Sequence, residues 1–256
     1  MGLTSALNKN EPAPGVHFDQ LSVRFAEQPL FENLSFSIEA GHWTCLLGAS
    51  GIGKSTLARL VIGIETGATV SGSVRIGSEP GTRHDVAWMA QDDLLYPWSN
   101  VLDNVMLGAR LRGDSQGARP RALALIRDVG LSGSEYKFPH ALSGGMRQRV
   151  ALARTLMEDS AVVVLDEPFG SLDAVTRATL QELAFELLKA RTVLLITHDP
   201  LEALRLGHSV LVLAGRPASL QPPIVPDVQP PRAVDSQGMA SMHATLLDAL
   251  ASDIAG

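Results

Sequence analysis

The chain has 256 residues, with 21 basic and 27 acidic side chains and a formal net charge of −6. This length suits one large domain that buries its own core, and 45% hydrophobic with 19% charged residues is a globular composition. The acidic balance argues against nucleic acid as the main ligand. The single cysteine, Cys45, excludes a disulfide framework or a cysteine-based zinc site within one chain.

No stretch reaches the roughly 20 apolar residues that a membrane span needs, so we expect a soluble, cytoplasmic protein. Residues 1–15 lack the apolar segment of a signal peptide and predict a flexible leader.

Strand and helix patterns alternate along most of the chain. Strand patterns cover residues 17–25, 34–38, 44–47, 86–90, 162–165, 193–196 and 210–213; helical patterns cover 54–65, 101–112, 121–129, a segment starting at 143, and 171–191. This alternation predicts a doubly wound α/β core, with the more polar middle part of the chain as a helical insertion. Residues 216–256 begin with a proline-rich stretch. The pattern from about residue 236 predicts a C-terminal helix.

A glycine loop lies between the strand pattern of residues 44–47 and the helix pattern of residues 54–65. It matches the phosphate-binding pattern G-x-x-x-x-G-K-[ST] with Gly48, Ala49, Ser50, Gly51, Ile52, Gly53, Lys54 and Ser55, followed by Thr56. Glycines let backbone N–H groups converge on phosphate oxygens at a helix N-terminus. Lys54 is expected to reach the β- and γ-phosphates, and the Ser55 hydroxyl to ligate Mg²⁺.

Two acids, Asp166 and Glu167, follow the apolar strand pattern of residues 162–165. In proteins with a phosphate loop, the acid at this strand end holds Mg²⁺, which is the role predicted for Asp166. Glu167 would then orient and polarise the attacking water as the general base.

A second anion site is predicted where residues 142–149 read Leu-Ser-Gly-Gly-Met-Arg-Gln-Arg. Ser143 is a good N-cap for the helix that follows, and Gly144 and Gly145 expose backbone N–H groups at its positive end.

These motifs, in this order, resemble the nucleotide-binding subunit of ATP-binding-cassette (ABC) transporters over about residues 16–215. The resemblance implies a P-loop NTPase core, with a RecA-like sheet, an N-terminal antiparallel β subdomain and a helical subdomain at about residues 92–157. It also implies hydrolysis of ATP, with Mg²⁺, to ADP and phosphate. In that family the Leu-Ser-Gly-Gly signature, here Ser143, Gly144 and Gly145, binds the γ-phosphate of ATP held by the other subunit. Met146 stands where glutamine is commoner.

The same resemblance assigns roles to four residues that carry little signal alone. Gln91 matches the glutamine that touches Mg²⁺ and the attacking water, and His198 matches the histidine that contacts the γ-phosphate. Asp173, in the loop of residues 171–173, matches a residue at the dimer interface. Phe25 matches the aromatic side chain that stacks on adenine, usually tyrosine; a core position is the alternative for it.

Three further residues lie close to these motifs. His140 and Arg147, near the signature, could touch nucleotide across the interface, but we expect them to be packing or surface groups. Cys45, on the strand that enters the phosphate loop, is expected to be a small core residue.

The partners are likewise implied by the resemblance. One copy of each motif implies a homodimer that sandwiches two ATP and two Mg²⁺, attached to separate membrane permease subunits at the cytoplasmic face of the inner membrane. Residues 93–98 and 101–105 look like those of nitrate, sulfonate, taurine and thiamine-precursor importers, which also use a solute-binding protein. Tyr96 and Trp98 could equally form a generic apolar docking surface.

Two other classes compete with a transporter subunit. A soluble ABC ATPase of DNA repair, chromosome structure or translation usually carries a coiled-coil insertion, zinc cysteines or two cassettes, and none is evident in this sequence. A P-loop kinase or GTPase is disfavoured by the Ser143–Gly145 signature and by the lack of an Asn-Lys-x-Asp motif.

Overall fold

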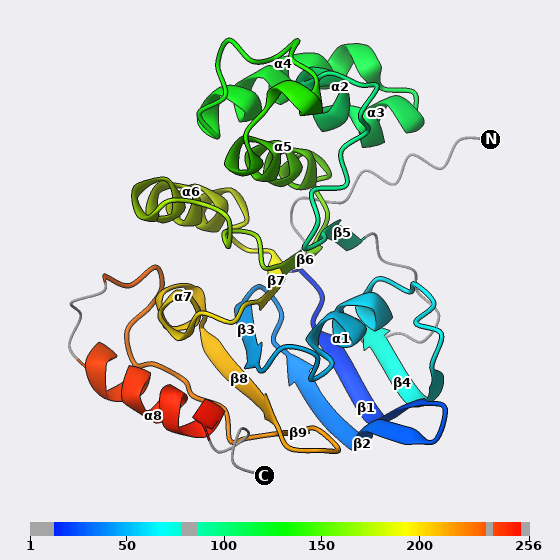
Figure 1. Cartoon of the computed structure of the whole chain (residues 1–256), viewed down its shortest axis with the longest axis vertical. Helices are drawn as coiled ribbons and strands as arrows, with labels where there is room; N and C mark the ends of the chain where they lie inside the picture. Colours follow the sequence, from blue (N-terminus) through cyan, green and yellow to red (C-terminus); the bar gives the residue numbers. More distant parts are fainter. Residues whose placement is uncertain (1–12, 78–85, 234–237, 252–256) are drawn as a thin grey trace.

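The computed structural model describes residues 13–77, 86–233 and 238–251 (Figure 1). The strands are β1 (Val16–Phe25), β2 (Gln28–Ile38), β3 (Trp43–Gly48), β4 (Thr69–Ile76), β5 (Val86–Met89), β6 (Val162–Asp166), β7 (Thr192–Ile196), β8 (Ser209–Ala214) and β9 (Ser219–Leu220). The α-helices are α1 (Lys54–Val61), α2 (Val101–Val105), α3 (Leu107–Leu111), α4 (Ser115–Asp128), α5 (Gly144–Met157), α6 (Ala174–Leu187), α7 (Pro200–Leu206) and α8 (Met239–Ala251).

The central sheet has the order β5-β6-β7-β3-β8-β9. Its first five strands are parallel, and β9 pairs antiparallel with β8. Strands β3, β6 and β7 are buried along their whole length, which is why their sequences are almost continuously apolar. Consecutive side chains face opposite layers: Cys45 and Leu47 join one core cluster, and Leu46 joins the other. The predicted α/β core and the core position of Cys45 are confirmed.

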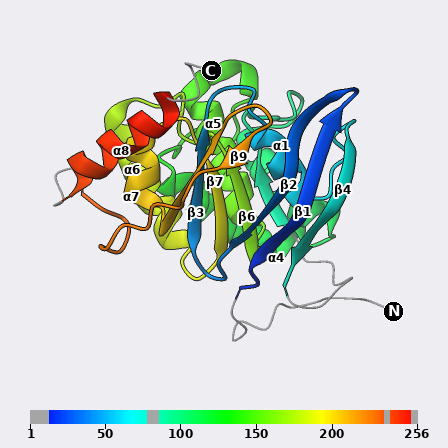
Figure 2. The same ribbon diagram turned by 90° about the horizontal axis from the view of Figure 1, so that it is seen from below.

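A second sheet of three antiparallel strands, ordered β2-β1-β4, shares one core cluster with α1 and one face of the central sheet. The blue and cyan strands of Figures 1 and 2 show this sheet beside the central one. The other core cluster holds residues of the helices on the opposite face, including α5, α6 and α7. The N-terminal antiparallel subdomain implied by the resemblance is therefore present.

Helices α2 to α5 form the helical part that the sequence predicted between the sheet strands β5 and β6 (Figure 1). Helix α5 packs against both α2 and α4. Helix α5 starts as predicted, because the Ser143 side chain accepts a hydrogen bond from Met146 N and caps it.

Several predicted boundaries are wrong. Strand β2 starts at Gln28, not at residue 34, and α1 ends at Val61, before Gly63 takes a positive φ of 72°. The predicted helix 101–112 is two short helices on either side of Met106, and α4 begins at Ser115 rather than 121.

The predicted helix 171–191 is shorter and runs from Ala174 to Leu187. It starts later because the Asp173 carboxylate accepts a hydrogen bond from Thr176 N, which makes Asp173 the N-cap. Residues 171–172 are therefore loop.

The two ends of the described chain lie against the core. Of the predicted leader, residues 1–12 lie outside the described residues, and Ala13 is buried. In the tail, Arg232 is buried and donates hydrogen bonds to the carbonyls of Leu204 and Gly207. Helix α8 packs on α7 and β8; it starts at Met239, and residues 234–237 are not among those described. None of the helices in the described ranges is long and apolar enough to cross a membrane.

Candidate nucleotide site

The predicted phosphate loop joins β3 to α1 and depends on its glycines. Gly48, Gly51 and Gly53 have φ of 157°, 80° and 110°, conformations that L side chains rarely adopt. A Cβ on Gly48 would lie 2.8 Å from the Leu213 carbonyl oxygen, and one on Gly53 would overlap the ring of Phe31. The loop therefore has this shape only because those positions carry no side chain.

Lys54 closes this loop from the start of α1. Its Nζ donates hydrogen bonds to the carbonyls of Gly48 and Ala49, at 2.8 and 2.9 Å. Burial lowers the pKa of Lys54, while the negative charges of Glu167 and Asp166 oppose that shift. An ammonium has three donors, so one is left to bind an incoming anion.

The two predicted acids lie at the end of β6, facing this loop. The buried Asp166 carboxylate accepts a hydrogen bond from the Ser55 hydroxyl. Burial raises the pKa of Asp166, and the Ser55 hydrogen bond opposes that rise. A carboxylate beside a hydroxyl is a donor set that suits Mg²⁺, which favours oxygen ligands, so these residues fit the predicted ion.

Two residues far apart in sequence, Gln91 and His198, meet at the Glu167 carboxylate. Gln91 Nε2 donates to Glu167 Oε2 at 3.3 Å, and His198 Nδ1 lies 3.3 Å from Glu167 Oε1. They come together because β5, β6 and β7 are adjacent parallel strands whose carboxyl ends share one edge of the sheet. The structure thus groups Gln91, Glu167 and His198 beside Asp166 and Lys54.

Phe25 lies at the end of β1 with 41% of its surface exposed, so the core alternative is wrong. Its side chain borders a cavity of about 310 Å³, together with residues of the phosphate loop. The other lining residues are Gln28, Pro29, Leu30, Ala49, Ser50, Gly51, Ile52, Gly215, Arg216, Pro217 and Ala218. Because the aromatic face of Phe25 is exposed beside the phosphate loop, stacking on adenine stays the prediction for this residue.

The signature residues are accessible at the start of α5. Ser143 and Gly144 are exposed, and in the described ranges no hydrogen bond joins them to the phosphate loop. Met146 is partly buried against the core, and His140 is exposed and stacks on Phe138. Asp173 is exposed at the cap of α6, where the Thr176 N–H lowers its pKa.

Two arginines of α5 hold the segment after Gln91. Arg147 pairs with Asp93 at 2.9 Å, and Arg154 donates to the carbonyls of Asp93 and Leu94 at 2.8 and 2.9 Å. Sequence reasoning singled out neither contact, because an arginine on a helix gives no local sign of a partner more than 50 residues away.

The glycine conformations predict different costs for two alanine substitutions. Gly53→Ala should destabilise the fold by about 2–4 kcal/mol, because it adds overlap with Phe31 to the strain of a left-handed backbone. Gly51→Ala, with nothing within 4 Å of its Cβ, should cost only about 1–2 kcal/mol. Urea unfolding of both variants measures this, and equal losses would contradict the packing argument.

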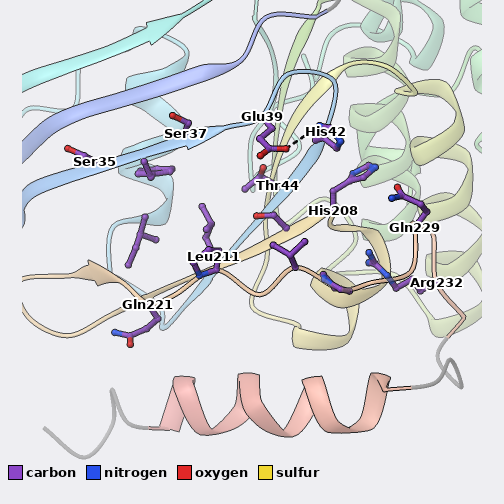
Figure 3. A pocket seen from close by; sticks show the side chains of 16 residues that line it. Ser35, Ser37, Glu39, His42, Thr44, His208, Leu211, Gln221, Gln229 and Arg232 are labelled. Carbon is purple, nitrogen blue, oxygen red and sulfur yellow. Dashed lines mark ion pairs between the residues drawn. The ribbon is translucent and has the colours of Figure 1, made fainter.

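Another cavity, of about 460 Å³, lies near the amino end of β3, away from the phosphate loop (Figure 3). The rings of His42 and His208 meet there edge to face, and His208 Nδ1 accepts a hydrogen bond from Trp43 N. Burial, followed by the charges of His42 and Arg232, lowers the pKa of His208 to about 4. None of the predicted site residues lines this cavity.

A glycine loop between a buried strand and a helix, facing carboxylates at the carboxyl edge of a parallel sheet, defines a P-loop nucleoside triphosphatase. The family model for the ABC transporter domain matches residues 31–170. An uncharacterized ABC transporter ATP-binding protein of Haemophilus influenzae is 43% identical over 242 residues, which cover 93% of this chain and 99% of the relative. Aliphatic sulfonates import ATP-binding proteins of Rhodococcus jostii and Escherichia coli are 43% and 39% identical, covering 89% and 95% of this chain and 89% and 92% of those relatives.

A chain from a solved ABC transporter in an inward-facing conformation matches with a TM-score of 0.65 and 23% identity, over 80% of this chain and 84% of that one. That match supports the fold. The chain belongs to the ATP-binding proteins of the ABC transporter family, whose members are ATPases coupled to transport.

Proposed function

We propose that this chain energises the import of a small organic anion, of the aliphatic sulfonate class, through separate membrane subunits. Nitrate, taurine and a thiamine precursor are the other solutes that the sequence allows. The relatives named as sulfonate import proteins support the solute class. The observation that carries the ATPase step is the meeting of Gln91, Glu167 and His198 at the edge that holds the phosphate loop.

In this proposal each residue around the phosphates acts according to its chemistry. Lys54 and the N–H groups of the loop bind the β- and γ-phosphates. Ser55, Asp166 and Gln91 hold Mg²⁺, which neutralises charge on the phosphates.

The acid–base residues act at the γ-phosphate. Glu167 accepts the proton of the attacking water, and Gln91 orients both the water and the carboxylate. His198 contacts the γ-phosphate from its exposed position after β7.

Two copies of the chain are needed for a complete site. The exposed Ser143 and Gly144 and the partly exposed Gly145 of one subunit bind the γ-phosphate that the phosphate loop of the other subunit holds. Asp173 lies at the interface between the two. Closure on ATP and opening after hydrolysis drive the membrane subunits, at the cytoplasmic face of the membrane, and a solute-binding protein delivers the anion to them.

The docking surface for the membrane subunits is the segment that follows Gln91. Leu94, Tyr96 and Trp98 are 54%, 40% and 74% exposed, and the two rings stack with their centres 5.2 Å apart. Asn104 binds both the N–H and the carbonyl of Tyr96, so the surface is held in one shape. Exposed aromatic groups on a fixed backbone are typical anchors of an interface.

The test is affinity purification of the tagged protein from detergent-solubilised native membranes, with mass spectrometry of the proteins that accompany it. We expect an integral membrane subunit, and Trp98→Ala should reduce its recovery by about tenfold or more. Tyr136→Ala, which removes another exposed aromatic group of the helical part, is the matched control and should leave recovery unchanged. Recovery with nucleic-acid or ribosomal proteins only would contradict the proposal and favour a soluble ABC ATPase.

A further inference from the structure

Gln148 lies on α5, three residues after the last signature residue, Gly145, and is 8% exposed. Both ends of its amide group are used. Nε2 donates to the carbonyl oxygen of Glu167 at 3.0 Å, and Oε1 accepts from Ser171 N at 3.1 Å and from the Ser171 hydroxyl. One side chain therefore joins α5 to the segment that carries the acidic pair and to the loop before α6.

The backbone of Glu167 needs such support. Its φ of 51° is left-handed, a conformation that is costly for a side chain of this size. Its N–H donates to the Ile196 carbonyl at 2.9 Å, which fixes one side of the residue to β7. On the other side its carbonyl receives Gln148 at 3.0 Å and, more distantly, Gly170 N at 3.4 Å.

The first turn of α5 lies close to the same loop. A Cβ on Gly145 would lie 3.4 Å from a methyl group of Leu172 and 3.6 Å from the Ser171 carbonyl oxygen. The hydrogen bonds of Gln148 therefore hold the start of α5 to Glu167 and Ser171, and Gly145 lies close to the same loop. A displacement of the start of the helix would carry the Glu167 backbone with it.

We propose that Gln148 is a positioning residue for hydrolysis, which holds the backbone of Glu167 in its left-handed conformation and ties it to the signature helix. This inference rests on the proposed role of Glu167 as the general base. Because the signature serves the ATP of the partner subunit and Glu167 serves the ATP of its own, Gln148 links the two sites through one side chain. Engagement of Ser143–Gly145 at one site then sets the position of the base at the other.

A double-mutant cycle on the full-length protein tests this inference. Gln148→Met keeps the length of the side chain and removes both hydrogen-bonding ends; we expect kcat to fall about tenfold or more, with the affinity for ATP changed less than about threefold. In the Glu167→Gln background, the same substitution should change the residual single-turnover rate by less than about twofold, because its effect acts through Glu167.

Three further variants control for stability and for the chemistry of the amide. Gln181→Met removes another buried glutamine, which binds Glu202 and Arg205, and should leave kcat of the folded fraction unchanged. Gln148→Glu keeps an acceptor for Ser171 but turns the donor to Glu167 into an oxygen, so its kcat should be as low as that of Gln148→Met. Ser171→Ala keeps the Ser171 N–H and should have the smaller effect.

Wild-type kcat in Gln148→Met, or a loss matched by Gln181→Met, would overturn the inference. An equal relative loss of hydrolysis rate when Gln148→Met is added to the wild type and to Glu167→Gln would also overturn the inference, since Gln148 would then act independently of Glu167. Full activity of Glu167→Gln alone would instead overturn the proposed function.

Discussion

Lys54→Ala is expected to lose ATP hydrolysis by about a thousandfold or more, because the β- and γ-phosphates lose their cation. The structure gives the reason in detail, since Lys54 is 7% exposed and fixed to two loop carbonyls beside Asp166 and Glu167. Binding of a fluorescent ATP analogue and release of phosphate measure the effect.

Lys189→Ala is the matched control for that substitution. Lys189 is exposed and pairs only loosely with Glu186, at 3.9 Å, so its loss should change neither binding nor hydrolysis. Because Lys54 also closes the loop, the thermal midpoint of both variants must be recorded. A folded Lys54→Ala protein with normal turnover would show that the phosphate loop is not the nucleotide site.

Glu167→Gln is expected to bind ATP with nearly unchanged affinity and to hydrolyse it about 10²–10⁴-fold more slowly. The amide has almost the same shape as the carboxylate, so it can still contact Gln91 and His198, but it cannot accept the proton of the attacking water. Single-turnover hydrolysis of radiolabelled ATP measures the rate, and filtration measures the ATP that stays bound. Glu186→Gln, an exposed acid of α6, should behave as the unchanged protein. Full activity in Glu167→Gln would show that Glu167 is not the general base.

The sequence predicts the buried part of the fold better than the exposed part, for a physical reason. Strands β6 and β7 are buried on both faces, so their sequences are runs of Val, Leu and Ile that allow few other structures. Strand β4 is mostly exposed, and Gly72 interrupts the alternation of Val70, Val74 and Ile76 with polar residues, so the sequence analysis does not include this strand. Helix α7 was missed because only seven residues form it.

The residues of the site also differ in how well the sequence predicts them, because some act within a short motif and others through contacts between distant segments. The phosphate loop and the acidic pair follow from short motifs, because the chemistry of each is contained in consecutive residues. Gln91 and His198 needed the resemblance to a family, since a single polar residue after a strand gives no sign of which strand lies beside it. Gln148 was not predicted at all, because its partners Glu167 and Ser171 are found only once α5 is placed against the end of β6.

In the proposed function, a complete ATP site takes the phosphate loop from one subunit and the signature from another. The most direct measurement is the mass in solution, by light scattering, of Glu167→Gln with ATP and Mg²⁺, with and without a second substitution, Ser143→Arg. Ser143 is exposed at the start of α5, so a larger side chain fits there. The substitution also removes the N-cap of α5, at a cost of about 1 kcal/mol, so the thermal midpoints of both proteins must be recorded. We expect a dimer of the 27.2 kDa chain for Glu167→Gln, and a monomer that still binds ATP when Ser143→Arg is added. A dimer that persists with Ser143→Arg, or a monomer that has lost ATP binding, would contradict a site shared between two subunits.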